Sequence, residues 1–450
     1  MGRNNQQRRA DKKRRSGRRQ HKRFQTNLGG VGDAVAAYAS EMIAIEGGEA
    51  AAHQDSGHLE EAVGLLMRLA GSAGLETVTA TLGRLVDSLL AAVFEGGWQA
   101  TEVARQLRRC QRDAHVGVVV AAMGSAGCWA EASGAAMPTT WSAQLDGLGV
   151  ASERDSCGNW LARFWAADQT PLPDGLRTVM EVMGELMHLP EIEVLQPRPS
   201  QWHDAVRLGI WADADDPVLA KVRALLAKAE STTFAAEAEA LTAKAQELMA
   251  RHSIDDALAR AAGSVRDAPA TRRLAVDNPY AEAKSLLLHA VVAANGARSV
   301  WYQGFAMMAV IGFRSDLDAI ELLFTSLLIQ ADKAMLEKGS VIDHRGRSRT
   351  RSFRQSFLVA YASRIGERLE MAALDARRHA ESDLHRSLVP VLAARDSEID
   401  DAVAAAFPHL RRIHGPSVTN EDGWRAGRVA AELATLGPRQ AMLDGMMAVG

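Results

Sequence analysis

The chain has 450 residues, of which 47% are hydrophobic and 24% are charged, so it is long enough for several domains with apolar cores. Three cysteines without C-x-x-C spacing argue against a disulfide framework and a cysteine-rich zinc site, and are typical of a reducing compartment. The net charge of −3 is unevenly spread: residues 1–24 hold eleven lysines and arginines and one acid, giving +10 and leaving −13 elsewhere. With no secretory signal and no apolar run of about 20 residues, we expect a cytoplasmic protein that has no membrane partner.

Residues 1–24 form a basic arm that has too few apolar side chains to fold by itself. Dense arginine with little acid is suited to contact the phosphates of DNA or RNA. The arginines that we expect to bind there are Arg14, Arg15, Arg18 and Arg19. A solubilising or partner-binding tail is the alternative.

Residues 25–195 have the periodicity of an all-α domain. Val86, Leu89, Leu90, Val93 and Phe94 follow the spacing of one buried helix face, and Gly96 and Gly97 end that helix. A second helix, from about Ala100, places four arginines on the side opposite its apolar face: Arg105, Arg108, Arg109 and Arg112. Helix, glycine turn and basic helix over residues 84–112 is the outline of a helix-turn-helix DNA reader, although a solvated helix face has the same spacing.

Two linkers, 196–216 and 257–277, are predicted on either side of a helical hairpin at residues 217–256. The hairpin begins with Pro217, which the first turn of a helix tolerates, and both helices carry an apolar stripe. Its acids and His252 look at first like a catalytic or metal site. However, Glu237 and His252 are fifteen residues apart, about 22 Å along a helix, so they cannot share one ion. We therefore interpret these residues as favourable helix ends.

Residues 278–450 are predicted to form an α+β domain. Residues 297–303 and 306–313 are rich in β-forming side chains around a glycine-containing turn, which predicts a small β-hairpin. Ser315 is a candidate N-cap for the following helix, and residues 387–393 are a candidate short strand. The fold class expected for the whole chain is thus mainly α, with an N-terminal all-α domain, a central helical hairpin and this α+β domain.

An arginine-rich loop precedes a helix that begins near Ser352. Its candidate phosphate contacts are Arg345, Arg347, Arg349, Arg351 and Arg354. Phe353, Phe357 and Tyr361 follow at i, i+4 and i+8, which would suit base stacking but is more typical of a core. We expect phosphate contact from the arginines and core packing from the aromatic residues.

The segment VRALLAKAESTTFAAEAEALTAKAQELMARHSID, residues 222–255, resembles the hairpin of domain-of-unknown-function family 2786, found in bacterial and phage proteins. The acid- and alanine-rich run from Glu237 to Met249 carries this resemblance. Segments such as VIGFRSDLDAIELLFTSLLIQA look like the α+β region that often follows it, and GGWQATEVARQLRR is similar to the N-terminal region of longer bacterial members. The resemblance implies an architecture and no established activity, so it supplies no catalytic residues.

Motifs of common enzymes are missing: there is no G-x-x-x-x-G-K-[ST], no G-x-G-x-x-G after a strand and no G-x-S-x-G. His53, Asp55 and His58 could ligate a metal from a loop, but a solvated polar loop explains them better. We expect no catalytic residue, metal or cofactor. The leading hypothesis is a non-catalytic protein that binds DNA or RNA phosphates. The alternatives are a scaffold that docks a protein partner on the 217–256 hairpin, and a hydrolase with a dispersed site.

Overall fold

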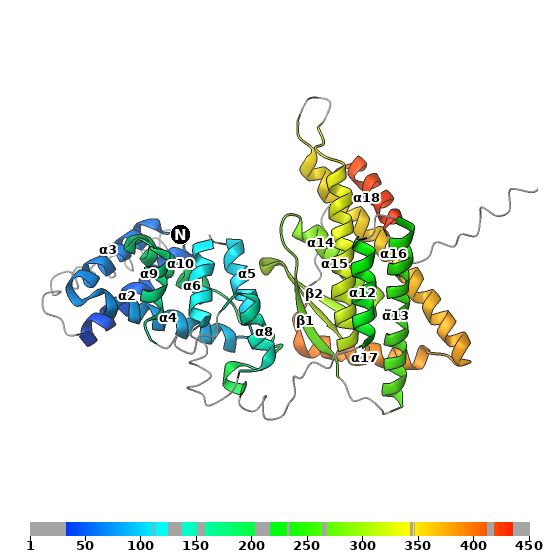
Figure 1. The fold of residues 1–450 in the computed structure, drawn as a ribbon, viewed down its shortest axis with the longest axis horizontal. Helices are drawn as coiled ribbons and strands as arrows, with labels where there is room; N and C mark the ends of the chain where they lie inside the picture. Colours follow the sequence, from blue (N-terminus) through cyan, green and yellow to red (C-terminus); the bar gives the residue numbers. More distant parts are fainter. Residues whose placement is uncertain are drawn as a thin grey trace, which may run out of the picture. The chain divides into compact units, whose positions relative to one another are not determined.

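A computed structural model gives the fold of the chain (Figure 1). It describes residues 33–110, 113–124, 137–150, 158–202, 217–231, 235–262, 268–342, 345, 347–411 and 418–434. These form two compact units, Met1–Asp213 and Ala214–Gly450. The protein is mainly α, with one small antiparallel sheet in the second unit, and this confirms the predicted fold class.

The described part of the first unit is helical. Its elements are α2 (Asp33–Ala52), α3 (Ser56–Ala73), α4 (Leu75–Glu95), α5 (Ala100–Cys110), α6 (Asp113–Gly124), α8 (Thr139–Gly147), α9 (Trp160–Asp168), α10 (Leu172–Met187) and the 3₁₀ turn η2 (Pro199–Gln201). Helices α2, α3, α4 and α10 pack on one another around a common core. Of the stripe predicted on α4, Val86, Leu90, Val93 and Phe94 are buried in that core and Leu89 is half-buried.

The start of the predicted linker at 196–216 belongs to the first unit. Trp202 is fully buried, donates a hydrogen bond from Nε1 to the carbonyl of Pro197 (3.2 Å) and packs against Trp141 with ring centres 5.5 Å apart. A buried tryptophan with a satisfied N–H is a core residue. The prediction of a linker was therefore wrong for residues 196–202, and the remainder of that segment lies outside the described residues.

The second unit combines helices with a three-stranded sheet. Its elements are α12 (Pro217–Ser231), α13 (Ala235–Ala261), β1 (Ala270–Ala275), α14 (Ala281–Ala294), β2 (Arg298–Tyr302), the 3₁₀ turn η3 (Gln303–Phe305), β3 (Met307–Gly312), α15 (Arg314–Glu337), α16 (Thr350–Leu384), α17 (Val389–Ala406) and α18 (Glu421–Leu433). The strand order is β1-β3-β2, and both pairs are antiparallel. Strands β2 and β3 are the predicted β-hairpin.

The sequence interpretation missed β1 and placed a linker at 257–277, where α13 continues to Ala261 and β1 begins at Ala270. β1 reads Ala-Thr-Arg-Arg-Leu-Ala and is an edge strand with only Leu274 buried, so it has no apolar run or clear alternation. A half-buried strand of this kind is paired by its backbone and leaves little trace in the hydrophobic pattern.

The central strand β3 is buried along its whole length because both faces of the sheet are covered. On one face, Met308 and Val310 join a core that includes residues of α14, α15 and α16. On the other face, Ala309 and Ile311 pack with Ile399 of α17. Residues 387–393, predicted as a strand, instead contain the start of this helix, with Pro390 in its first turn, where the missing N–H costs nothing.

The sequence had suggested that the helical hairpin is a separate domain. In the structure it is part of the second unit. Val222 and Leu226 of α12 and Ala245 and Met249 of α13 lie in the same core cluster as β3. The hairpin packs on α15, and α13 also contacts α16 and α17. Two helices with narrow apolar stripes cannot bury enough surface alone, so they depend on this neighbouring layer.

Truncating Ile399 tests whether α17 is a required cover for the sheet. Ile399→Ala removes fully buried methyl groups against Ile311 and should lower the free energy of unfolding by about 2–5 kcal/mol. Val389→Ala, at an exposed position of the same helix, is the matched control and should change it by less than about 0.5 kcal/mol. Urea unfolding followed by circular dichroism measures both, and equal effects would show that α17 does not stabilise the sheet.

Candidate functional site

The segment between α15 and α16 carries three of the arginines predicted to contact phosphate, and two more lie in the first turns of α16. The two ends of the segment are held together: the N–H of Arg349 donates to the carbonyl of Val341 (2.7 Å), and Ile342 pairs with Ser348 in an antiparallel bridge. The hydroxyl of Thr350 also accepts from the N–H of Val341 at 3.0 Å. The described residues at the two ends of this segment are therefore held side by side.

We call Arg345, Arg347, Arg349, Arg351 and Arg354 the arginine cluster. The first four are exposed and Arg354 is half-buried, so the structure brings the predicted set together at the N-terminal end of α16. The first turn of α16 contains no acidic residue, and residues 344–366 contain six arginines and no aspartate or glutamate. The positive end of the helix dipole adds to this charge. The arrangement favours an anionic ligand.

The aromatic residues that follow the cluster are core residues, as expected. Phe353, Phe357 and Tyr361 are 5%, 0% and 1% exposed, and Tyr361 donates a hydrogen bond to the carbonyl of Leu327 (3.3 Å). Burial raises the pKa of the Tyr361 hydroxyl well above its ordinary value. These rings therefore hold α16 in place and do not offer a surface for stacking bases.

Helix α18 packs closely on the start of α16. A Cβ atom on Gly423 would lie 2.4 Å from the carbonyl oxygen of Phe353, and one on Gly427 would lie 2.2 Å from that of Phe357. Glycines four residues apart let the two helix backbones approach each other. The arginine cluster thus stands on the end of a helix that is fixed by α18 and by its own aromatic residues.

The second predicted arginine set lies on α5. Arg108 is exposed, Arg105 and Arg109 are half-buried, and Arg109 donates to the side chain of Gln106 (3.1 Å). Arg112 lies outside the described residues, as do Arg14, Arg15, Arg18 and Arg19 of the arm. Arg108 is thus the member of the described set that is most open to a ligand.

The turn before α5 is enclosed by its own domain. Gly97 has a φ of +97°, and a Cβ there would lie 2.4 Å from the carbonyl oxygen of Ile192. The N–H of Ile192 donates to the carbonyl of Gly96 (2.8 Å), and Trp98 donates from Nε1 to that of Pro190 (2.8 Å). The main packing partners of α5 are α6 and α8. Only the outward face of α5 can therefore meet a ligand.

A buried polar cluster that the sequence interpretation missed lies where the end of the hairpin meets α15 and α17. Arg395 of α17 is 8% exposed and forms an ion pair with Asp316 of α15, which is 5% exposed. Arg395 also donates to the carbonyl oxygen (3.0 Å) and the hydroxyl (2.9 Å) of Ser253. Burial and the nearby Arg260 guanidinium lower the pKa of Arg395 to about 10, so it remains a cation at neutral pH.

The polar end of the hairpin takes part in the same cluster. Asp256 accepts a hydrogen bond from the hydroxyl of Ser315 (2.8 Å) and lies 3.6 Å from Nδ1 of His252. Ser315 was predicted as the N-cap of α15, but Phe313 occupies that position and the Ser315 side chain turns to α13 instead. Arg260 and Arg395 lie over the ring of Phe313, 3.7 and 4.7 Å from its centre. Asp256 at the end of the hairpin thus joins α13 to α15, and His252 lies beside it on the same helix.

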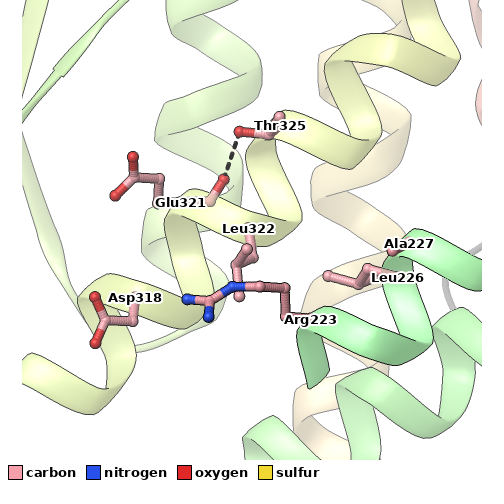
Figure 2. A pocket seen from close by; sticks show the side chains of 7 residues that line it. All are labelled: Arg223, Leu226, Ala227, Asp318, Glu321, Leu322 and Thr325. Atoms are coloured by element: carbon pink, nitrogen blue, oxygen red, sulfur yellow. Dashed lines mark hydrogen bonds between the residues drawn. The ribbon is translucent and has the colours of Figure 1, made fainter. Parts of the chain in front are cut away.

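A shallow groove of about 370 Å³ lies between α12 and α15 (Figure 2). Figure 2 shows Arg223 reaching from α12 toward Asp318, while the carboxylate of Glu321 points away from it. Arg272 of β1 pairs with Asp318 (2.6 Å) and with Glu321 (2.8 Å). Burial lowers the pKa of Arg272, but the two carboxylates outweigh this and raise it overall. The acids of the groove are thus already neutralised from the β1 side.

The described residues contain no group of three or more histidine, cysteine or acidic side chains placed to hold a metal ion. Within the predicted alternative of His53, Asp55 and His58, the pair Asp55 and His58 has a plain structural role. Asp55 caps α3 by accepting from the N–H of His58 (3.3 Å) and bonds to its ring nitrogen (2.7 Å), and these hydrogen bonds lower the pKa of Asp55. Asp55 is therefore a helix cap.

The described residues include one helix, α4, that is long and apolar enough to cross a membrane by length and composition alone. Half of its most apolar stretch is buried inside the first unit. A core helix of a globular domain passes the same test.

The fold and the arginine cluster describe a mainly α protein with an antiparallel three-stranded sheet and a cationic surface. Within it, residues 218–256 match the family described as "Protein of unknown function (DUF2786)". This match confirms the resemblance of the hairpin; it spans α12 and most of α13. No curated protein and no solved structure matches the chain.

Separating the two buried charges tests the polar cluster. Asp316→Asn leaves Arg395 buried without its carboxylate and should lower the free energy of unfolding by about 3–5 kcal/mol. The double substitution Asp316→Leu with Arg395→Met removes both charges and should restore most of that loss. The measurement is urea unfolding at pH 7.

The control for this comparison is Asp375→Asn, which breaks an exposed ion pair with Arg378 (3.1 Å) and should cost less than about 1 kcal/mol. A loss of equal size at both aspartates would refute a special role for the buried pair.

Proposed function

We propose that the protein is a non-catalytic nucleic-acid-associated protein that binds backbone phosphates of DNA or RNA without strong choice of sequence. The observation that supports this proposal is the arginine cluster. Four exposed arginines follow one another at alternate positions, from Arg345 to Arg351, at the positive end of a 35-residue helix whose first turn has no acid.

The chemistry of guanidinium suits this role. Each arginine offers donors in a planar fork that matches two phosphate oxygens, and it stays protonated at any physiological pH. Contacts of this kind hold the backbone of a nucleic acid and carry no sequence information. A surface built from them fixes the position of a strand without reading its bases.

The packing of the first turns of α16 fixes the position of the arginine cluster on the second unit. Phe357 and Tyr361 are fully buried, and Gly423 brings α18 against the first turns of α16. The cluster would therefore orient a bound strand on the second unit. The basic arm, residues 1–24, would add affinity through further phosphate contacts, and Arg108 on α5 would add one more on the first unit.

The scaffold alternative has less support. The described apolar residues of the hairpin, Val222, Leu226, Ala245 and Met249, are used in the core of the second unit. Among the described hairpin residues that are exposed and could meet a protein partner are the charged Lys221 and Arg223.

Replacing Arg345, Arg347, Arg349 and Arg351 together by alanine should weaken binding to a short duplex and to a single strand alike. The slope of log K against log salt should become shallower by about 0.9 for each duplex phosphate that the variant no longer neutralises. Fluorescence anisotropy over a series of salt concentrations measures both quantities. Substituting alanine for Arg378 and Arg425, exposed arginines paired with Asp375 and Glu421, is the matched control and should leave binding unchanged. Wild-type affinity in the four-fold variant would rule out the arginine cluster as the site.

Removing the arm tests whether the folded part has a site of its own. A chain of residues 25–450 should still bind, with a shallower salt dependence, because the arm contributes phosphate contacts and the arginine cluster remains. Binding that disappears with the arm would mean that the cluster is an ordinary solvated surface. The same anisotropy titration decides between these outcomes.

A further inference from the structure

Two histidines lie side by side in the first unit. His53 directly follows α2 and His188 directly follows α10. Their ring centres are 5.7 Å apart, and the ring planes are almost perpendicular, at 84°. Both side chains are exposed, so an ion from solvent can reach them.

The hydrogen bonds of these histidines define the tautomer of each ring. Nδ1 of His53 is 2.7 Å from the carbonyl oxygen of Glu49, and Nδ1 of His188 is 2.9 Å from that of Gly184. A carbonyl oxygen can only accept, so each Nδ1 carries the proton. The lone pair of each neutral ring is therefore on Nε2, the nitrogen not engaged by the backbone. A histidine that binds a metal through one nitrogen and donates from the other to a carbonyl has this arrangement.

The helices that carry the two rings are in close contact. A Cβ atom on Gly184 would lie 2.5 Å from the carbonyl oxygen of Gly48, and 3.1 Å from the backbone nitrogen of Ala52. Backbones that touch in this way cannot slide past each other without a clash. The carbonyl that orients His188 thus belongs to a residue at the contact between α2 and α10, which keeps the two histidines at a constant separation.

The spacing of the rings fits a shared ion. With metal–nitrogen bonds of about 2.0–2.1 Å and a tetrahedral angle, the centres of two imidazoles on one ion lie about 5–6 Å apart. The observed 5.7 Å is in this range.

We propose that His53 and His188 form a two-histidine site for a divalent transition-metal ion of the class that prefers imidazole, namely Zn²⁺, Ni²⁺ or Cu²⁺. The described residues supply no third ligand of the histidine, cysteine or acidic type. The remaining coordination positions are therefore taken by water or by a ligand from outside the chain. Such an ion exchanges readily, and among these metals Cu²⁺ binds most tightly.

Titration of the full chain with Cu²⁺, followed by isothermal calorimetry and electron paramagnetic resonance, tests this site. The wild-type protein should bind one ion more tightly than the others, with nitrogen couplings from two imidazoles. His53→Ala and His188→Ala should each weaken the affinity of that site for Cu²⁺ by at least roughly 10–100-fold, the loss that removal of an outer-shell partner causes. Each variant should retain the nitrogen coupling of one imidazole. His58→Ala, which removes a neighbouring exposed histidine already bonded to Asp55, is the control and should keep both properties.

Circular dichroism of the variants checks that they are still folded. Because both histidines are exposed, we expect the spectra of the variants to match that of the wild type. Two results would overturn the site. One is a tight Cu²⁺ site that survives in the double variant His53→Ala with His188→Ala. The other is a wild-type spectrum with only one imidazole nitrogen on the ion.

Discussion

Burial of the central strand β3 on both faces is the constraint on which the second unit depends. A three-stranded sheet covered on one face would leave Ala309 and Ile311 in water, whereas all six residues of β3 are buried. Strands buried on both faces read as continuous apolar runs, and Met-Met-Ala-Val-Ile-Gly is such a run. Two separate helical layers are then required. Helices α14, α15, α16 and the hairpin supply the first, and α17 supplies the second.

The second layer explains the buried charges. Helix α17 turns Ile399 toward the sheet, and Arg395, one turn earlier on the same side, is buried with it. An uncompensated guanidinium in a core would be very costly, so it requires a carboxylate. Asp316 is suited to this because it lies in the first turn of α15, where the helix dipole stabilises negative charge. Since Arg395 also bonds to Ser253 of α13, one side chain joins three helices. The polar contacts at the end of the α12–α13 hairpin are thus a consequence of covering the sheet with α17.

Local patterns predicted the helices and the β2–β3 hairpin because amphipathic spacing and apolar runs are properties of short segments. They failed where tertiary contacts decide. β1 carries Arg272, whose charge is paired with Asp318 and Glu321 on α15, so the position of this strand depends on residues far along the chain. Val389-Pro390-Val391 has strand-forming residues, but packing against the sheet makes it the start of a helix. The positions of the arginine cluster were predictable. The Arg395–Asp316 pair was not, because no local rule relates residues so far apart.

The arginines of the second unit outside the arginine cluster show how this fold balances charge. Arg272, Arg298 and Arg395 each have an acidic partner on another element. Arg364 and Arg428 share Glu367, whose pKa is lowered by hydrogen bonds from both. A folded surface that only needs solvation interleaves the two signs in this way, because like charges close together repel and destabilise the compact state. The sequence of residues 344–354 has five arginines and no acid, next to a helix end that is itself positive. A phosphate backbone would suit the proposed role of this surface because it supplies several negative charges at once.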